Sequence, residues 1–239
     1  MTLGLKVDIR VKLGNFALTA KFQTSNEVIV LIGPSGSGKS TILSCIAGLQ
    51  KPETGEIRLA EKILFDSEKQ IFVPPHERHF AYLLQNNALF PHLNVAGNIC
   101  YALSKQSKAQ QAARLEELLT IFRIEDLRNF KVSQLSGGQA KRVALARALA
   151  AVPKLVLLDE PFSALDEDLR EELANELKGL QKQLNVPMVL VTHSKQEALF
   201  MADTLLRIEQ GRIIASGSPE ALLLDRAIEQ TTDKMQFSW

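Results

Sequence analysis

A short apolar strand that runs straight into a glycine-rich loop is the feature that most constrains how this chain can fold. Five apolar residues, Val28–Ile32, are followed at once by GPSGSGKST at residues 33–41. The pattern G-x-x-x-x-G-K-[ST], placed after a strand and before a helix, is typical of a phosphate-binding loop. It therefore predicts an α/β protein whose parallel strands present ligand-binding loops at their carboxyl ends.

Each residue type in the loop suits the binding of a nucleoside triphosphate. The glycines let the backbone curl so that its N–H groups face phosphate oxygens, and a helix expected at residues 41–49 adds its positive N-terminus. Lys39 is expected to reach the β- and γ-phosphates of ATP, and the Ser40 hydroxyl to ligate Mg²⁺. The predicted ATP-binding residues are Gly33, Pro34, Ser35, Gly36, Ser37, Gly38, Lys39, Ser40 and Thr41.

Three further apolar runs predict strands that are buried on both faces: residues 81–84, 155–158 and 188–191. Gln85 follows the first run, and Asp159 with Glu160 follows the second. His193 comes shortly after the third. Because ligands of open α/β sheets bind outside the carboxyl ends of the strands, we expect these side chains to share a site with the loop. We also expect the strands of Gln85 and His193 to flank the strand of the loop.

The two adjacent carboxylates suit the hydrolysis of a nucleotide. Adjacent strand residues point to opposite faces, so Asp159 is expected to hold Mg²⁺ while Glu160 polarises the attacking water as general base, a role worth roughly 10² to 10⁴ in rate. Gln85 is expected to contact the metal or the water, and His193 to hydrogen-bond a γ-phosphate oxygen. An isolated pair of this kind is more often a solvated strand end. A phosphate-binding loop in the same chain favours the catalytic interpretation.

A second candidate anion site lies at LSGGQ, residues 135–139, which opens a helical run at residues 140–150. Paired glycines at a helix start expose backbone N–H groups, and Ser136 adds a donor. This site falls in a stretch, residues 91–150, that lacks the strand pattern and is expected to be mostly helical. From the residues alone it stays open whether this helix start serves the chain's own nucleotide or that of another molecule.

Composition narrows the classes of function. Lysine and arginine number 28 against 27 acidic residues, and a net charge of +1 argues against nucleic-acid binding through bulk charge. The first residues lack the pattern of a signal peptide, and no apolar stretch approaches the roughly 18 to 20 residues that span a bilayer. Cys45 and Cys100 lack metal-ligand spacing and are expected to be apolar fillers in a reducing compartment. We therefore expect a cytoplasmic protein that reaches a membrane only through another chain.

Six motifs together resemble those of the ATP-binding cassette (ABC) family of ATPases and occur in the family's order. They are the phosphate-binding loop, Gln85, LSGGQ, LVLLDEP at residues 155–161, SALD at residues 163–166, and His193. The resemblance implies an α/β P-loop NTPase (RecA-like) core with a mostly parallel sheet, an N-terminal antiparallel β subdomain and an inserted helical subdomain. Residues 1–239 are then one ABC ATPase domain, with a nucleotide-binding core at 1–90 and 151–225, a helical subdomain at 91–150 and a tail at 226–239.

The same resemblance implies a head-to-tail homodimer that sandwiches two ATP molecules, each between the loop of one chain and LSGGQ of the other. The residues then expected to act in trans on the partner's γ-phosphate are Ser136, Gly137, Gly138 and Gln139. Asp166 is expected to communicate across the dimer. The resemblance assigns hydrolysis to Lys39, Gln85, Glu160 and His193, and the Mg²⁺ site to Ser40, Gln85 and Asp159.

Residues 74–99 look like the segment with which the ATPase subunits of bacterial importers dock a membrane subunit. Residues 63–102 are similar to the ATPases of molybdate and related oxyanion importers. We therefore expect an ATPase on the inner face of the cell membrane, coupled to uptake through integral membrane permease subunits and indirectly through a substrate-binding protein. The alternatives are an importer of another substrate class, a soluble ABC ATPase without a membrane partner, and a non-hydrolytic ATP-gated clamp.

Three features depart from the family pattern. Many members place an aromatic residue that stacks on adenine where this chain has Leu13, and we expect Phe16, a few residues on, to be a strand-core residue. Lys141 replaces the usual glutamine after LSGGQ and is expected to lie on the helix surface with little effect. Molybdate-type ATPases often carry a further C-terminal ligand-sensing domain, whereas this chain ends at Trp239, so we expect no feedback through such a domain.

Overall fold

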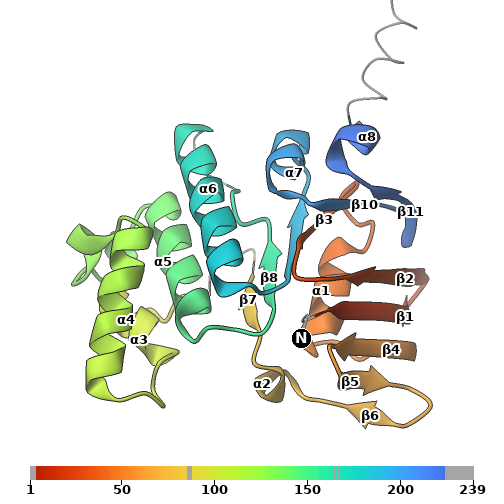
Figure 1. Ribbon diagram of the computed structural model, residues 1–239, viewed down its shortest axis with the longest axis horizontal. Coiled ribbons are helices and arrows are strands. Elements are labelled where there is room, and N and C mark those ends of the chain that lie inside the picture. The colour runs from red at the N-terminus through yellow and green to blue at the C-terminus, as the bar shows by residue number, and fades with distance from the viewer. Residues whose placement is uncertain (1–3, 85–87, 164, 166, 224–239) are drawn as a thin grey trace, which may run out of the picture. The chain divides into compact units, whose positions relative to one another are not determined.

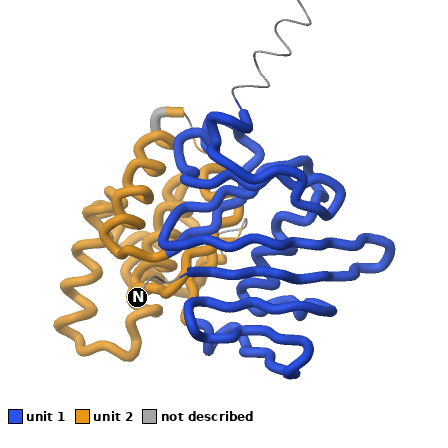
Figure 2. The backbone as a smooth tube through the Cα atoms, turned by 45° about the vertical axis from the view of Figure 1, so that its right-hand side comes forward, with its two compact units in different colours: residues 1–78, 187–239 blue, residues 79–186 orange. Residues whose placement is uncertain are grey.

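The computed structural model describes residues 4–84, 88–163, 165 and 167–223 (Figure 1). The chain divides into two compact units, which Figure 2 shows in different colours. Unit 1 comprises residues 1–78 and 187–239, and unit 2 comprises residues 79–186. Unit 2 is therefore a continuous insertion, and unit 1 is built from both ends of the sequence.

The strands of unit 1 follow the order β6-β5-β4-β1-β2-β11-β10-β3-β9. The strands are β1 (Leu5–Leu13), β2 (Phe16–Thr24), β3 (Val28–Ile32), β4 (Thr54–Leu59), β5 (Lys62–Asp66), β6 (Ile71–Phe72), β9 (Met188–Thr192), β10 (Thr204–Glu209) and β11 (Arg212–Gly217). The helices are α1 (Lys39–Ala47), α2 (Pro75–Arg78), α7 (Lys195–Met201) and α8 (Pro219–Leu223). Strands β6 to β2 pair antiparallel, whereas β3 pairs in parallel with both its neighbours. The expected antiparallel N-terminal part and parallel core are confirmed.

The sequences of β1 and β2 explain the antiparallel part. Apolar and polar side chains alternate along both strands, and the buried ones include Leu5, Val7 and Ile9 in β1 and Leu18 in β2. One face of this part therefore packs on the core while the other carries polar side chains. The chain turns between the two strands at Gly14, whose φ of 57° suits glycine.

All residues of β3 and β9 are buried, in agreement with their continuous apolar sequences. Of the two strands that we expected beside β3, one lies there and the other does not. Strand β9, which precedes His193, does flank β3, but β7, which precedes Gln85, pairs with β8 in unit 2. The other neighbour of β3 is β10 from the last hairpin, because its buried Leu205 and Leu206 supply the apolar contact that a central parallel strand needs.

Unit 2 is mostly helical. Its elements are β7 (Ala81–Leu83), α3 (Val95–Tyr101), α4 (Lys108–Ile121), the 3₁₀ helices η1 (Glu125–Leu127) and η2 (Val132–Gln134), α5 (Gly137–Ala150), β8 (Val156–Asp159) and α6 (Glu167–Leu184). Helix α5 packs against α3, α4 and β7, and β7 pairs in parallel with β8. In α6 the buried Leu173, Leu177 and Leu180 recur at steps of three and four residues, as an amphipathic helix requires.

Among the helices that the structure describes, none is both long enough and apolar enough to span a bilayer.

Candidate nucleotide-binding site

The loop that follows β3 leads into α1, which begins at Lys39. We expected this helix at residues 41–49, but it spans Lys39–Ala47 because Gly38 is already its N-cap. No side chain caps this start. The first backbone N–H groups of α1 are therefore left for a ligand, and the helix dipole favours an anion there.

Glycine is required at two positions of the loop. A Cβ atom on Gly33 would lie 2.0 Å from the carbonyl oxygen of Ile208 in β10. Gly38 has a φ of 103°, and a Cβ atom there would lie 2.2 Å from the side chain of Leu18. A larger residue at Gly33 would clash with the backbone of β10, and one at Gly38 would be strained by the positive φ and would have to displace the Leu18 side chain.

Lys39 and Ser37 place two polar groups at this loop. The Lys39 Nζ atom donates hydrogen bonds to the carbonyl oxygens of Gly33 at 2.9 Å and Pro34 at 2.8 Å. The buried Ser37 hydroxyl has no hydrogen-bond partner among the described residues. Leaving a buried polar atom unsatisfied is costly, and a phosphate oxygen would satisfy it. Together with the exposed Ser40 at the helix start, these groups fit the phosphates of a nucleotide.

Two cavities of unit 1 adjoin the loop. One, of about 420 Å³, is lined by Gly33, Pro34 and Ser35 on one side and by His193 on another, so His193 and the loop share it. The other, of about 570 Å³, is lined by residues 34–37 of the loop and by Phe16.

The burial of Phe16 differs from what we expected from the sequence. We expected a strand-core residue, but Phe16 is only half-buried at the first position of β2. Its ring lies close enough to the loop that a Cβ atom on Gly38 would be 3.3 Å from its Cζ atom. The alternation of β2 does not bury the ring, because Phe16 stands at the first position of the strand and lines the cavity beside the loop.

Several hydrogen bonds stabilise the turn that carries His193. His193 is exposed and directly follows β9. The next residue, Ser194, is the N-cap of α7, and its hydroxyl accepts a hydrogen bond from the Glu197 backbone N–H at 3.2 Å. The Thr192 hydroxyl accepts from the Ser194 N–H at 3.0 Å and donates to the Glu197 carboxylate. The backbone on both sides of His193 is thereby held in place.

The two carboxylates lie at the end of β8 in unit 2. Asp159, the last residue of the strand, is 7% exposed. Glu160 lies beyond the strand with a φ of 49°, a left-handed conformation that is rare for a residue with a side chain. Ser163 stabilises this turn, since its backbone N–H and its hydroxyl donate to the Glu160 carbonyl at 3.2 and 2.9 Å. Strand alternation, on which we based the orientation of Glu160, therefore does not apply to it.

The burial of Lys141 also differs from what we expected. We expected it on the surface of its helix, but it is only 2% exposed. Burial lowers the pKa of its ammonium, while the charges of Asp159 and Glu160 act in the opposite direction. Helix α5 is buried on nearly all sides in this region, which explains why the polar character of lysine did not predict its exposure.

The LSGGQ sequence forms the start of α5. Ser136 is the N-cap, its hydroxyl accepts from the Gln139 N–H at 3.2 Å, and its own N–H donates to the Gln139 side chain at 2.9 Å. A Cβ atom on Gly137 would meet no atom within 4 Å, whereas one on Gly138 would lie 3.1 Å from Leu165. The first turn of α5 is thus capped, exposed at Gly137 and open to a ligand.

Gln85 and Asp166 lie outside the described residues. The other predicted site residues fall into two groups. The loop, Lys39 and His193 belong to unit 1, while Asp159, Glu160 and residues 136–139 belong to unit 2.

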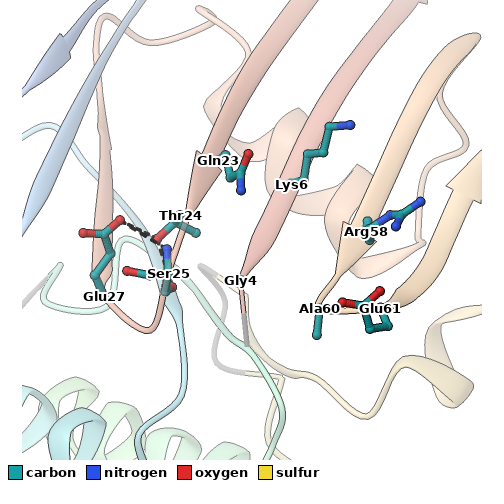
Figure 3. A pocket seen from close by; sticks show the side chains of 9 residues that line it. All are labelled: Gly4, Lys6, Gln23, Thr24, Ser25, Glu27, Arg58, Ala60 and Glu61. Carbon is teal, nitrogen blue, oxygen red and sulfur yellow. Dashed lines mark hydrogen bonds between the residues drawn. The ribbon is translucent and has the colours of Figure 1, made fainter. Parts of the chain in front are cut away.

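A further cavity of unit 1, of about 550 Å³, lies at the far end of β2 from Phe16 and includes Lys6, Arg58 and Glu61 (Figure 3). Its polar groups largely satisfy one another. The Thr24 hydroxyl donates to Glu27 at 2.8 Å, as the dashed line in Figure 3 shows, and Lys6 and Arg58 both pair with Glu56. We assign no nucleotide to this cavity.

The fold and the loop together define a P-loop nucleotide-binding protein of the α/β class. A family model described as ABC transporter matches residues 19–163, and the chain belongs to the ABC transporter family. Membership of this family implies that the chain binds ATP.

The curated relatives of this chain are named as import proteins. The molybdenum import ATP-binding protein ModC of Rhizobium meliloti (strain 1021) is 39% identical over 219 residues, which cover 92% of this chain and 61% of that protein. The Fe(3+) ions import ATP-binding protein FbpC of Haemophilus influenzae (strain 86-028NP) is 43% identical over 198 residues, covering 82% of this chain and 56% of that protein. The chain thus spans about three fifths of the length of the curated relatives it matches.

Solved structures show the same fold. The ATP-binding cassette MJ0796, determined as a dimer in a post-hydrolysis state bound to ADP and Pi, matches with a TM-score of 0.74 and 29% identity over 92% of this chain and 99% of that chain. The cbiO1 protein of Clostridium perfringens matches with a TM-score of 0.80 over 97% of this chain and 94% of that chain. At 24% identity, this second match is a likeness of fold alone.

Proposed function

We propose that this chain is the ATP-binding and ATP-hydrolysing subunit of an ABC membrane importer. The observation that carries the proposal is that each unit has a glycine-containing helix start with backbone N–H groups suited to an anion: α1 after Gly38 and α5 after Ser136. The triphosphate of one nucleotide needs only the first. In a head-to-tail dimer, the second helix start of each chain serves the nucleotide of its partner, so that both starts of both chains are used.

The proposal divides the chemistry between the units. In unit 1, Lys39 exchanges the carbonyl oxygens of its loop for β- and γ-phosphate oxygens, which are stronger acceptors, and His193 donates to the γ-phosphate. In unit 2, Glu160 accepts a proton from the attacking water while the water oxygen bonds to the γ-phosphorus. The bond between the γ-phosphorus and the β–γ bridging oxygen breaks, and ADP leaves with that oxygen. Mg²⁺, for which the oxygens of Ser40 and Asp159 are suitable ligands, would supply charge neutralisation of the phosphates.

We propose Phe16 as the residue that stacks on adenine. Its half-buried ring lines the cavity that also includes residues 34–37 of the phosphate-binding loop, so a nucleotide held by the loop brings its base toward the ring. Stacking of a base on an aromatic side chain contributes about 1–3 kcal/mol. Leu13, the residue at the usual aromatic position, is 44% exposed at the end of β1 and offers no ring.

The proposed cargo is molybdate or a related oxyanion. Three molybdenum import proteins align over 92 to 97% of this chain, whereas iron and polyamine import proteins align over 82%. Within their shorter alignments the latter are somewhat more identical, at 41 to 43% against 36 to 39%. An importer of ferric iron or of a polyamine is therefore the second candidate, and a soluble ABC ATPase is the third.

The experiment that tests this function uses the Glu160→Gln variant. It should bind ATP with the affinity of the wild type but lose at least about a hundredfold in turnover, because the amide cannot accept the proton of water. The ATP-bound dimer should then accumulate. Tagged Glu160→Gln would be expressed in its native host, and the proteins that co-purify with it would be identified by mass spectrometry.

The outcomes separate the candidates. Permease subunits together with a receptor that binds molybdate in calorimetry would support the proposal, whereas a receptor for ferric iron or a polyamine would change the cargo alone. Exclusively soluble partners would overturn the importer function and leave the ATPase. Hydrolysis by Glu160→Gln at the rate of the wild type would contradict the role of Glu160.

A further inference from the structure

Lys141 is a buried cation that the chemistry proposed above does not use. The residue is 2% exposed, and its Nζ atom has no hydrogen-bond partner among the residues that the structure describes. A lysine ammonium carries three donors, and burying it without partners is unfavourable to folding. Such a group is retained in a fold only where something offsets its cost or where it serves a function.

The charges that oppose this cost in part are the two carboxylates at the end of β8, although burial has the larger effect on the pKa of Lys141. The start of α5 also lies beside the chain that follows Glu160, since a Cβ atom on Gly138 would be 3.1 Å from the Leu165 side chain. Helix α5 packs against β7, which pairs in register with β8, so that Leu83 lies beside Leu158. Asp159 follows Leu158 directly and Glu160 comes next. The charges of both carboxylates act on the Lys141 ammonium, and no other charged group of unit 2 acts on it to a comparable extent among the described residues.

The same helix carries the LSGGQ sequence. Ser136 caps α5, and Lys141 lies little more than one turn further along it. The helix start is thus linked to the buried ammonium through a single short stretch of the same helix. Any displacement of the first turns of α5 must also move the ammonium relative to the carboxylates, because a helix moves as a body over so short a distance.

We propose that Lys141 is a positioning residue, whose buried ammonium holds Asp159 and Glu160 by charge and connects them to the LSGGQ end of α5. The inference rests on the proposed function, since it requires Glu160 to be the general base. When the LSGGQ end of α5 engages a partner's nucleotide, the ammonium follows and sets the carboxylates for hydrolysis of the chain's own nucleotide. The coupling of the two sites is then built into one helix.

The test compares Lys141→Met and Lys141→Arg with the wild type. Methionine is unbranched like lysine and one heavy atom shorter, so it keeps most of the side chain and removes the charge, whereas arginine keeps the charge. We expect Lys141→Met to lower kcat about tenfold, with KM and the Kd for an ATP analogue changed less than twofold and the melting temperature equal to or above that of the wild type. Lys141→Arg should restore kcat to within about threefold of the wild type. If Lys141 had a purely structural role, Lys141→Met would instead lower the melting temperature, and it would not lower kcat while leaving KM unchanged.

Arg147→Met is the matched control. Arg147 is another partly buried cation of α5, but it contacts the ring of Phe90 at 5.0 Å and donates to the Ala88 carbonyl at 2.8 Å. This control should keep the basal kcat of the wild type. A kcat of Lys141→Met within twofold of the wild type, or an equal loss in Arg147→Met, would overturn the inference.

Measuring Glu160→Gln in the same assays shows whether a negative result contradicts only the role of Lys141 or also the proposed function. If the wild type hydrolyses ATP, Glu160→Gln does not, and Lys141→Met is unaffected, then only the role of Lys141 is wrong. If Glu160→Gln hydrolyses ATP like the wild type, the general base is wrong and the inference about Lys141 falls with it.

Discussion

Lys39 is held by two carbonyl oxygens of its own loop, and this geometry determines what its removal should do. The ammonium is already ordered at the loop before it exchanges these two acceptors for phosphate oxygens, so little conformational entropy is lost when it binds phosphate. We predict that Lys39→Ala weakens ATP binding by at least about tenfold, which the titration of a fluorescent ATP analogue would measure. The exposed Lys51 beyond α1 supplies the control variant Lys51→Ala, which should bind as the wild type does. Equal affinities in all three proteins would exclude a phosphate contact by Lys39.

Cys45 gives a prediction for the dependence of stability on pH. Burial raises the pKa of its thiol from 9.0 to about 12. Between these values the unfolded chain loses a proton that the folded chain keeps, so stability falls as pH rises. Between pH 8 and pH 10 the free energy of unfolding of the wild type should fall by about 1 kcal/mol more than that of Cys45→Ala. Urea unfolding at the two pH values measures both, and parallel losses in the two proteins would contradict the assignment.

The residues that sequence reasoning misplaced have a common cause. Lys141 and Phe16 were judged by residue type and by local periodicity, but burial is a property of what packs around a side chain. Residues on almost every side of α5 are buried or half-buried, so the helix has no exposed face to which Lys141 could be assigned. Glu160 was judged as a strand residue, whereas the strand ends one residue earlier.

At the scale of elements, the C-terminal end of α1 depends on one buried cation. The Arg78 guanidinium donates to the carbonyl oxygens of Cys45 at 3.1 Å and Ile46 at 2.6 Å, in the last turn of the helix, where carbonyl oxygens lack their usual partner four residues on. The Cys45 oxygen also accepts from the Gly48 N–H at 3.1 Å. Gly48 follows with a φ of 80°, and a Cβ atom there would lie 2.5 Å from the Arg78 Nε atom. We predict that Gly48→Ala lowers the free energy of unfolding by about 2 kcal/mol, from backbone strain and from displacement of Arg78.

The same substitution of glycine by alanine at another helix position should raise the free energy of unfolding instead of lowering it. Gly179 lies within α6, is exposed and would place a Cβ atom in open space. Alanine favours a helix interior over glycine by about 0.5–1 kcal/mol, so Gly179→Ala should stabilise the protein by that amount. Urea unfolding of both variants measures the pair. If Gly48→Ala is as stable as the wild type, the contact with Arg78 does not support the helix end.

Element types could be predicted from the sequence more fully than their order in the sheet. The buried strands β3, β8 and β9 were found from apolar runs of four or five residues, with ends correct to within one residue. The position of β7 was wrong, because parallel strands are joined by long connections and local sequence does not specify which strands become neighbours. The start of α1 was two residues late, since the left-handed Gly38 ends the loop earlier than the motif pattern suggests.

For the whole molecule, the head-to-tail arrangement predicts complementation between two inactive variants. Lys39→Ala removes a phosphate ligand from one side of each site. Gly137→Asp adds a carboxylate at the exposed start of α5, where the fold has room for it and a phosphate does not tolerate it. An equal mixture should regain about a quarter of the wild-type ATPase rate, because half of the dimers are mixed and each mixed dimer has one intact site of two.

An ATPase assay of the mixture against each variant alone measures this recovery. A sum of the two separate rates would show that the α5 start does not act on a partner's nucleotide. Two copies of the same variant, mixed as a control, should show no gain.

The motifs of the candidate site were all visible in the sequence, but their distribution between two units was not. Loop and strand-end residues can be recognised locally because glycine, lysine and carboxylates have few roles in such patterns. The division of the chain depends on long-range packing, which groups Lys39 and His193 in unit 1 and the residues around Glu160 in unit 2.

The discontinuous build of unit 1 also affects how the protein is made on the ribosome. Val28 in β3 pairs with Met188 in β9, about 160 residues later in the chain. At a synthesis rate of about 5–20 residues per second, β3 waits roughly 8 to 30 seconds for this neighbour, and slightly longer for β10. During that interval a strand of five apolar residues has no partner from the same sheet core on either side. Slow translation or a missing chaperone should therefore expose this strand to aggregation long before the nucleotide site can form.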